Sequence, residues 1–167
     1  MAVASSGTAK ITLPTDEQIL ITREFDAPKH LVYQAYTTPE LVKRWWPGKR
    51  GEMTSCEIDL RVGGVWRYVM VAKGGFEVAF HGEYREIVPD ERIVTTEVYE
   101  GAEADGLPEE DAPLNIVTFT EADGRATLSL LVQCTTKDLR DMILDSGMEA
   151  GMQEGFDLLE ELAISLR

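Results

Sequence analysis

The sequence predicts an α+β domain in which one curved antiparallel sheet packs against a long C-terminal helix, with two short helices after the first strand. Three patterns lead to this prediction. An early β-rich run precedes two proline-marked helix starts, a series of segments alternates between apolar and polar residues, and the last segment carries an apolar stripe at helical spacing. The 167 residues suit a single domain that buries a sizeable core.

The first strand is expected at residues 18–25, which are rich in isoleucine and other β-formers, and a shorter strand at residues 10–13 precedes it. Residues 1–9 are small and polar and offer nothing to bury. We therefore expect a flexible N-terminal tail at residues 1–9, followed by one domain over residues 10–167.

Two short helices should follow the first strand. Asp26 and Pro28 are typical of a helix start, because an Asp side chain can cap the first turn and proline is tolerated in it. Thr38 and Pro39 repeat the pattern and predict a second short helix, which ends at Pro47.

The middle of the chain alternates with a period of two, which predicts strands. The expected segments are 52–60, 64–72, 77–88, 91–100, 113–121 and 125–134. Because turn residues separate closely spaced strands, the pattern predicts an antiparallel meander. The one long connection, residues 101–112, is acidic and contains Pro and Gly, so we expect a solvated loop that could gate a binding site.

The end of the chain should be helical. Thr136 can cap a first stretch, and Ser146 and Glu149 fit a capping box, so the helix restarts or kinks there. Beyond this point, apolar residues share one arc of the helix: Met148, Met152, Phe156, Leu159, Ala163 and Leu166. Glycines 147, 151 and 155 recur at a spacing of four, which indicates either close approach of a neighbour or space kept beside the methionines.

Composition excludes several partners. Sixteen basic and thirty acidic residues give a net charge of −14, which repels nucleic acid and anionic membrane surfaces. We see no secretory signal and no apolar run of about 20 residues, so we expect a cytoplasmic protein. Cys56 and Cys134 form no C-x-x-C pair and are expected to be reduced. The sequence leaves open whether the protein is a monomer or a homodimer.

No catalytic set, metal site or cofactor site is predicted. The phosphate-loop, dinucleotide, zinc-protease, nucleophile-elbow and EF-hand motifs are all absent. His30 should face solvent, and His81 could neighbour Glu83, but one imidazole among scattered carboxylates is more typical of an exposed sheet face. Enzymatic activity is therefore not expected, although the sequence does not decide it.

Large aromatic and methionine side chains suggest a ligand cavity, because Met adapts to irregular spaces and Trp and Tyr add a polar tip to an apolar wall. The alternative is that the same residues simply fill the core. The candidate ligand-binding residues are Trp45, Trp46, Trp66, Tyr68, Met70, Phe80, Tyr84, Phe119, Met148, Met152 and Phe156.

Four segments resemble one known family. They are Ile21–Pro28, Trp45–Pro47, Arg61–Trp66 and Asp141–Met152, in the same order along the chain. They are similar to segments of the activator of Hsp90 ATPase homologue 1-like family, within the START/Bet v 1-like (SRPBCC) superfamily. The resemblance implies a helix-grip fold with a deep hydrophobic cavity between the sheet and the long helix. It also implies that Trp66 and Met152 border that cavity, and it transfers no catalytic residues.

These observations lead to three functional hypotheses. The first is a protein that binds a hydrophobic or aromatic small molecule of the lipid, polyketide or flavonoid type. The second, which rests on the resemblance alone, is a co-chaperone-like regulator of an Hsp90-type ATPase. The third is a cyclase- or hydrolase-type enzyme. The first hypothesis requires that the terminal helix lie on the sheet without filling the space between them.

Overall fold

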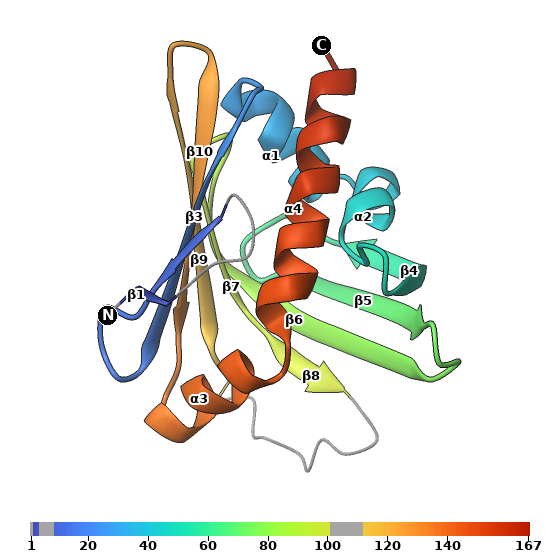
Figure 1. Cartoon of the computed structure of the whole chain (residues 1–167). Helices are drawn as coiled ribbons and strands as arrows, with labels where there is room; N and C mark the ends of the chain where they lie inside the picture. Colours follow the sequence, from blue (N-terminus) through green and yellow to red (C-terminus); the bar gives the residue numbers. More distant parts are fainter. Residues whose placement is uncertain (1, 4–8, 101–111) are drawn as a thin grey trace.

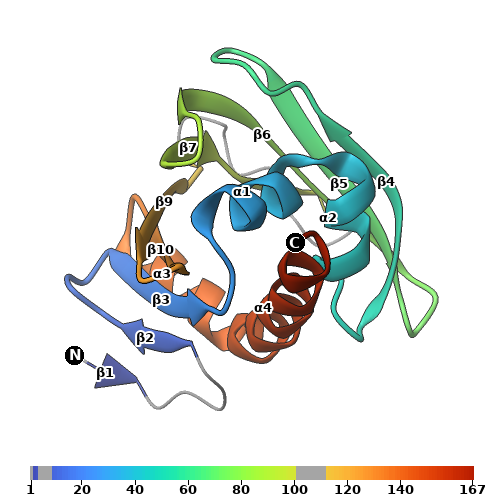
Figure 2. The ribbon, with the colours of Figure 1, turned by 90° about the horizontal axis from the view of Figure 1, so that it is seen from above.

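The computed structural model describes residues 2–3, 9–100 and 112–167, and these form one antiparallel sheet with helices on its concave side (Figures 1 and 2). The strands are β1 (Ala2–Val3), β2 (Lys10–Thr12), β3 (Gln18–Phe25), β4 (Gly51–Ile58), β5 (Val65–Ala72), β6 (Glu77–Val88), β7 (Arg92–Thr96), β8 (Val98–Glu100), β9 (Leu114–Ala122) and β10 (Arg125–Gln133). The helices are α1 (Lys29–Thr37), α2 (Pro39–Trp45), α3 (Lys137–Asp145) and α4 (Met148–Ser165).

The sheet follows the order β1-β2-β3-β10-β9-β7-β6-β5-β4, with β8 paired to β6. Bulges interrupt the register between Met53 and Ser55 on β4 and between Tyr84 and Glu86 on β6. Since a bulge bends its strand, these two sites help to curve the sheet around α1, α2 and α4, as the view from above shows (Figure 2). The predicted fold class is thereby confirmed, with the two short helices following β3.

The expected strand at 91–100 is two strands that meet at Glu97. β7 pairs with β6 and β9, whereas β8 pairs with an earlier part of β6. Gly82 of β6 lies at the step between these two pairings. A side chain at position 82 would overlap the carbonyl oxygen of Thr96. Glycine therefore allows the backbone of β6 to approach the end of β7 closely at this point. Because of this step between β7 and β8, the side chain of Glu97 points into the layer between the sheet and the helices.

Three residues of the N-terminal segment that the structure describes, Ala2, Val3 and Ala9, form hydrogen bonds with the rest of the domain. Ala2 and Val3 pair with β2. Ala9 is fully buried, its backbone N–H donates to Gln153 Oε1 at 3.1 Å, and its carbonyl accepts from Gln153 Nε2 at 3.2 Å. Residues 1 and 4–8 lie outside the described residues, as does most of the predicted acidic loop, residues 101–111.

The glycines of the terminal helix serve close packing. The helix restarts at Gly147, whose φ of +83° is in the left-handed region, and Thr136 caps α3 by accepting from the Leu139 N–H at 3.1 Å. A Cβ at position 151 would lie 3.1 Å from the Arg50 guanidinium carbon, and one at position 155 would lie 3.3 Å from the Trp45 carbonyl oxygen. Of the two interpretations of these glycines, the structure supports close approach of a neighbouring segment.

Candidate functional site

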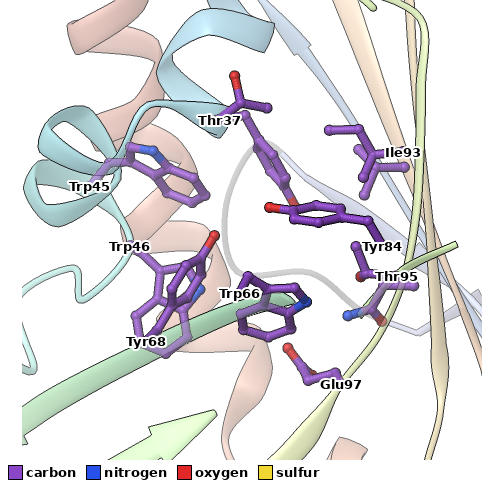
Figure 3. Close-up of a pocket in the computed structure, with 12 residues that line it drawn as sticks. Thr37, Trp45, Trp46, Trp66, Tyr68, Tyr84, Ile93, Thr95 and Glu97 are labelled. Carbon is purple, nitrogen blue, oxygen red and sulfur yellow. The ribbon is translucent and has the colours of Figure 1, made fainter. Parts of the chain in front are cut away.

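A cavity of about 60 Å³ lies between the sheet and the α1–α2 pair (Figure 3). Six of its lining residues are aromatic and come from both the helices and the sheet. The twelve residues that line it are Tyr36, Thr37, Trp45, Trp46, Trp66, Tyr68, Tyr84, Ile93, Thr95, Glu97, Asn115 and Val117. All three tryptophans of the chain are among them.

Local sequence fixes the helical wall. The carbonyl of Ala35 would normally accept from the backbone N–H four residues later, but that residue is Pro39, which has none. The indole N–H of Trp45 donates to this carbonyl instead, at 2.9 Å, and so ties α2 to α1. The Tyr36 ring packs against the Trp45 ring with centroids 5.3 Å apart. The proline that begins α2 therefore also creates the acceptor that orients Trp45.

Strand register brings polar side chains into one row on the sheet wall. Tyr84 of β6 is paired with Thr95 of β7, and Thr95 with Asn115 of β9. Glu97 directly follows β7 and lines the same cavity as Thr95. Figure 3 shows Thr95 and Glu97 on the same side of the cavity as Tyr84. A phenol, a hydroxyl, a carboxamide and a carboxyl group are thus brought together within an otherwise apolar layer.

Aromatic rings from β5 and from the end of α2 form another part of the wall. The centroid of Tyr68 lies 5.3 Å from that of Trp46 and 4.7 Å from that of Trp66. Trp66 Nε1 is the buried side-chain polar atom that has no hydrogen-bond partner among the described residues. It lies beside Gly82 and has almost no accessible surface, so Trp66 offers the cavity its ring rather than its N–H.

Burial shifts the pKa values of the ionisable groups of the cavity upward. Burial raises the pKa of Glu97, and a hydrogen bond with the Asn115 side chain partly opposes this shift. Burial also raises the pKa values of Tyr36, Tyr68 and Tyr84 well above the ordinary value. None of the described residues that line the cavity is a lysine, arginine or histidine. The site can supply aromatic faces, hydroxyl groups and one carboxyl group, but no positive charge.

The structure brings together five of the eleven predicted site residues: Trp45, Trp46, Trp66, Tyr68 and Tyr84. Phe80 packs behind Trp46, with ring centroids 5.3 Å apart, and Phe119 packs against Tyr36 at 5.7 Å. Phe156 of α4 contacts Phe25 and Trp45. Met148 and Met152 pack against the core from α4, and Met70 is half-buried on β5. The cavity that the structure shows is therefore bordered by α1 and α2, whereas the expected cavity was bordered by the terminal helix.

Seven lining residues were missed at the sequence level: Tyr36, Thr37, Ile93, Thr95, Glu97, Asn115 and Val117. A signal for some of them exists. Thr95 and Glu97 continue the face of the buried Ile93, and Asn115 continues the face of the buried Val117. Polar residues in register with buried apolar ones mark either a strand end or a polar group that faces the interior.

The remaining candidates for chemistry lie elsewhere. His30 is exposed, as predicted, and His81 Nδ1 lies 2.6 Å from Glu100 Oε2, while Glu83 pairs with Arg85. Across the described residues no group of His, Cys, Asp and Glu could hold a metal ion. No helix in the described part of the chain has both the length and the apolar character needed to span a bilayer.

Comparison with known protein families shows which family the chain belongs to. The model of the activator of Hsp90 ATPase homolog 1-like protein family matches residues 26–163. The chain belongs to this family. The resemblance seen in the four sequence segments is thereby confirmed. No curated protein matches the chain.

Solved structures share the fold over nearly the whole chain. A protein from Rhodobacter sphaeroides is 22% identical with a TM-score of 0.84, and the match covers 95% of this chain and 99% of that one. A Chromobacterium violaceum protein is 28% identical with a TM-score of 0.75, covering 89% and 98%. The AHSA1-like protein from Aeromonas hydrophila is 19% identical with a TM-score of 0.63, covering 88% and 93%.

Proposed function

We propose that this member of the Hsp90-activator-like family binds a small hydrophobic or aromatic molecule in the cavity between the sheet and the α1–α2 pair. The observation that carries the proposal is the cavity itself, whose wall combines six aromatic rings with a few buried polar side chains. Such a wall is typical of small-molecule sites, where apolar surface provides affinity and a few polar groups orient the ligand.

The size of the cavity limits what enters it in this conformation. About 60 Å³ is well below the roughly 300–1,000 Å³ of drug-sized ligand sites. Trp46 and Tyr68 are half-buried, whereas Trp45 and Trp66 are only 4% and 5% exposed. Trp46 also lies directly after the last residue of α2 and before Pro47. We infer that the Trp46–Tyr68 pair is the part of the wall that moves to admit a ligand.

Intrinsic tryptophan fluorescence tests the proposal, because every tryptophan of the chain lines the cavity. Titration with small aromatic compounds, flavonoids, polyketides and lipids should produce a saturable change in emission for at least one class. Amide resonances of Trp66 and Tyr68 should shift in the same titration. If no compound changes either signal while the protein stays folded, the proposal is wrong.

The family match supports a second candidate, regulation of an Hsp90-type ATPase. The net charge of −14 would favour a basic docking surface on such a partner. ATPase assays with and without this protein, at low and high salt, separate the two candidates. A rate that rises at low salt and returns to the basal value at high salt supports the regulator hypothesis, and an unchanged rate removes it.

We also propose a cytoplasmic location, in keeping with the free thiols of Cys56 and Cys134.

A further inference from the structure

We propose that the cavity selects a small organic cation, a methylated ammonium group, which the aromatic rings surround and for which Glu97 is the counter-ion. This inference rests on the proposed function and narrows its ligand to one chemical class. It follows from three properties of the same wall: the arrangement of its rings, its charge, and the position of its one carboxyl group.

The rings surround the cavity from several elements. Tyr36 and Trp45 come from the helices, Trp66 and Tyr68 from β5, and Tyr84 from β6. Figure 3 shows Trp45, Trp46 and Tyr68 on one side of the cavity, Tyr84 on the opposite side, and Trp66 between them. The negative face of an aromatic ring attracts a cation, and this attraction is stronger where water is excluded. Proteins commonly bind quaternary ammonium ligands within a set of aromatic rings of this kind, called an aromatic cage.

The charge of the wall discriminates against anions. None of the described lining residues is cationic. Burial of a carboxylate or phosphate head group beside Glu97, within a chain of net charge −14, would leave that charge without a partner. Fatty acids and acidic phospholipids are therefore disfavoured, whereas a positive head group is favoured.

Glu97 is positioned to accompany such a head group. It is half-buried and lines the cavity, and in Figure 3 its carboxyl group points toward the Trp66 ring. The described lysines, arginines and histidines make no ion pair with it. The titratable groups around it are the phenols of Tyr36 and Tyr68, with Tyr84 and Cys56 beyond them, and all four are neutral at physiological pH. Among the residues that the structure describes, none therefore supplies a positive charge to Glu97, whereas a cationic ligand would.

Three molecules of nearly equal shape and different charge test the proposal. Choline carries a trimethylammonium group, 3,3-dimethylbutan-1-ol replaces its nitrogen with carbon, and 3,3-dimethylbutanoate is the corresponding anion. Titrations monitored by tryptophan fluorescence should give a Kd for choline that is at least about tenfold lower than that for the alcohol, with no binding of the anion.

Two variants locate the effect. Glu97→Gln should bring the affinities for choline and the neutral alcohol close to each other. Glu24→Gln removes an exposed carboxylate on β3, changes the net charge by the same amount, and should leave the preference for choline intact. If E97Q does not fold, the pH dependence of the wild-type protein replaces it. Choline affinity should rise as pH rises through the Glu97 pKa, because the ligand requires the carboxylate, and the affinity for the alcohol should stay constant.

The results separate this inference from the proposed function. Equal or tighter binding of the alcohol, or an unchanged choline preference in E97Q, overturns the cation site while small-molecule binding stands. If none of the three molecules binds but a neutral aromatic compound does, the cation site is again overturned. Failure of every compound to bind the folded protein removes both proposals.

Discussion

The α4–β3 interface and the cavity differ in whether their buried polar groups are paired with partners of complementary charge or hydrogen-bonding capacity. In the α4–β3 interface, Arg23 is 4% exposed and donates to the Phe156 carbonyl and to Asp157, both at 2.8 Å. Gln153, at 6% exposure, holds both backbone groups of Ala9. In the cavity, by contrast, Trp66 Nε1 has no partner among the described residues, and Glu97 is flanked by phenols and a carboxamide rather than by a cation.

This difference shows which region serves stability and which serves binding. Satisfied buried polar groups stabilise one arrangement of α4 on the sheet, because each bond lost there would leave a buried group without a partner. The cavity wall instead retains buried polar groups and open volume, which lower stability unless a ligand compensates for them. The comparison predicts that substitutions in the two regions have separable effects on unfolding and on binding.

Leu159→Ala and Ile93→Ala test this separation with the largest expected effect. Both side chains are buried, with 0% and 2% exposure, but only Ile93 lines the cavity. Each truncation should lower the free energy of unfolding by about 3 kcal/mol in urea titrations. Ligand Kd should be unchanged in L159A, whereas I93A should admit compounds that are too large for the wild type. Altered selectivity in L159A would show that the two regions are coupled.

Arg23→Met tests whether paired polar groups hold α4. The change keeps most of the aliphatic volume but removes the donors to Phe156 and Asp157, so it should cost about 2 kcal/mol of unfolding free energy. Arg85→Met is the matched control, because Arg85 pairs with Glu83 on an exposed surface and should change stability by less than about 0.5 kcal/mol. Equal losses in both variants would show that apolar contacts alone hold the helix.

The sequence predicted the fold because its signals are local. Alternation over the middle strands, Pro39 at a helix start and the apolar arc of α4 each depend on neighbours within a few positions. The break at Glu97 was missed because its cause, the approach of the Thr96 carbonyl to Gly82, joins residues of two different strands.

The cavity was predicted only in part for the same reason. Large aromatic residues marked five of its residues, but a core residue and a cavity residue look alike in sequence: Phe119 and Tyr84 are equally apolar in pattern, and only Tyr84 lines the space. The role of Trp45 depends on the unpaired carbonyl of Ala35, and the role of Glu97 on a row of residues from three strands. Such pairings become visible only when the elements are placed in space.

Trp45→Phe and Trp66→Phe sharpen the comparison within the cavity wall itself. The Trp45 N–H satisfies the Ala35 carbonyl, so its removal leaves a buried acceptor without a partner, whereas the Trp66 N–H has no acceptor to lose among the described residues. The two changes remove the same atoms, and W45F should therefore cost about 1–2 kcal/mol more than W66F in urea unfolding. Equal costs would mean that the Ala35 carbonyl finds another donor.

The smallest expected effect concerns the pH dependence of Glu97. Because burial raises the pKa of Glu97 in the folded state above its ordinary value of about 4.5, the native state keeps its proton up to a higher pH than the unfolded chain does. Wild-type stability should therefore fall as pH rises from about 4.5 through the folded-state pKa and then level off, and E97Q should lack this fall. Glu100 provides a control of opposite sign, since its hydrogen bond with Arg67 lowers its pKa. Glu100→Gln should remove a stabilisation that is present above the unfolded pKa and lost in acid. Urea unfolding across this pH range measures the stability of both variants relative to the wild type. A stability difference between E97Q and wild type that does not change with pH would show that Glu97 stays ionised in the cavity wall.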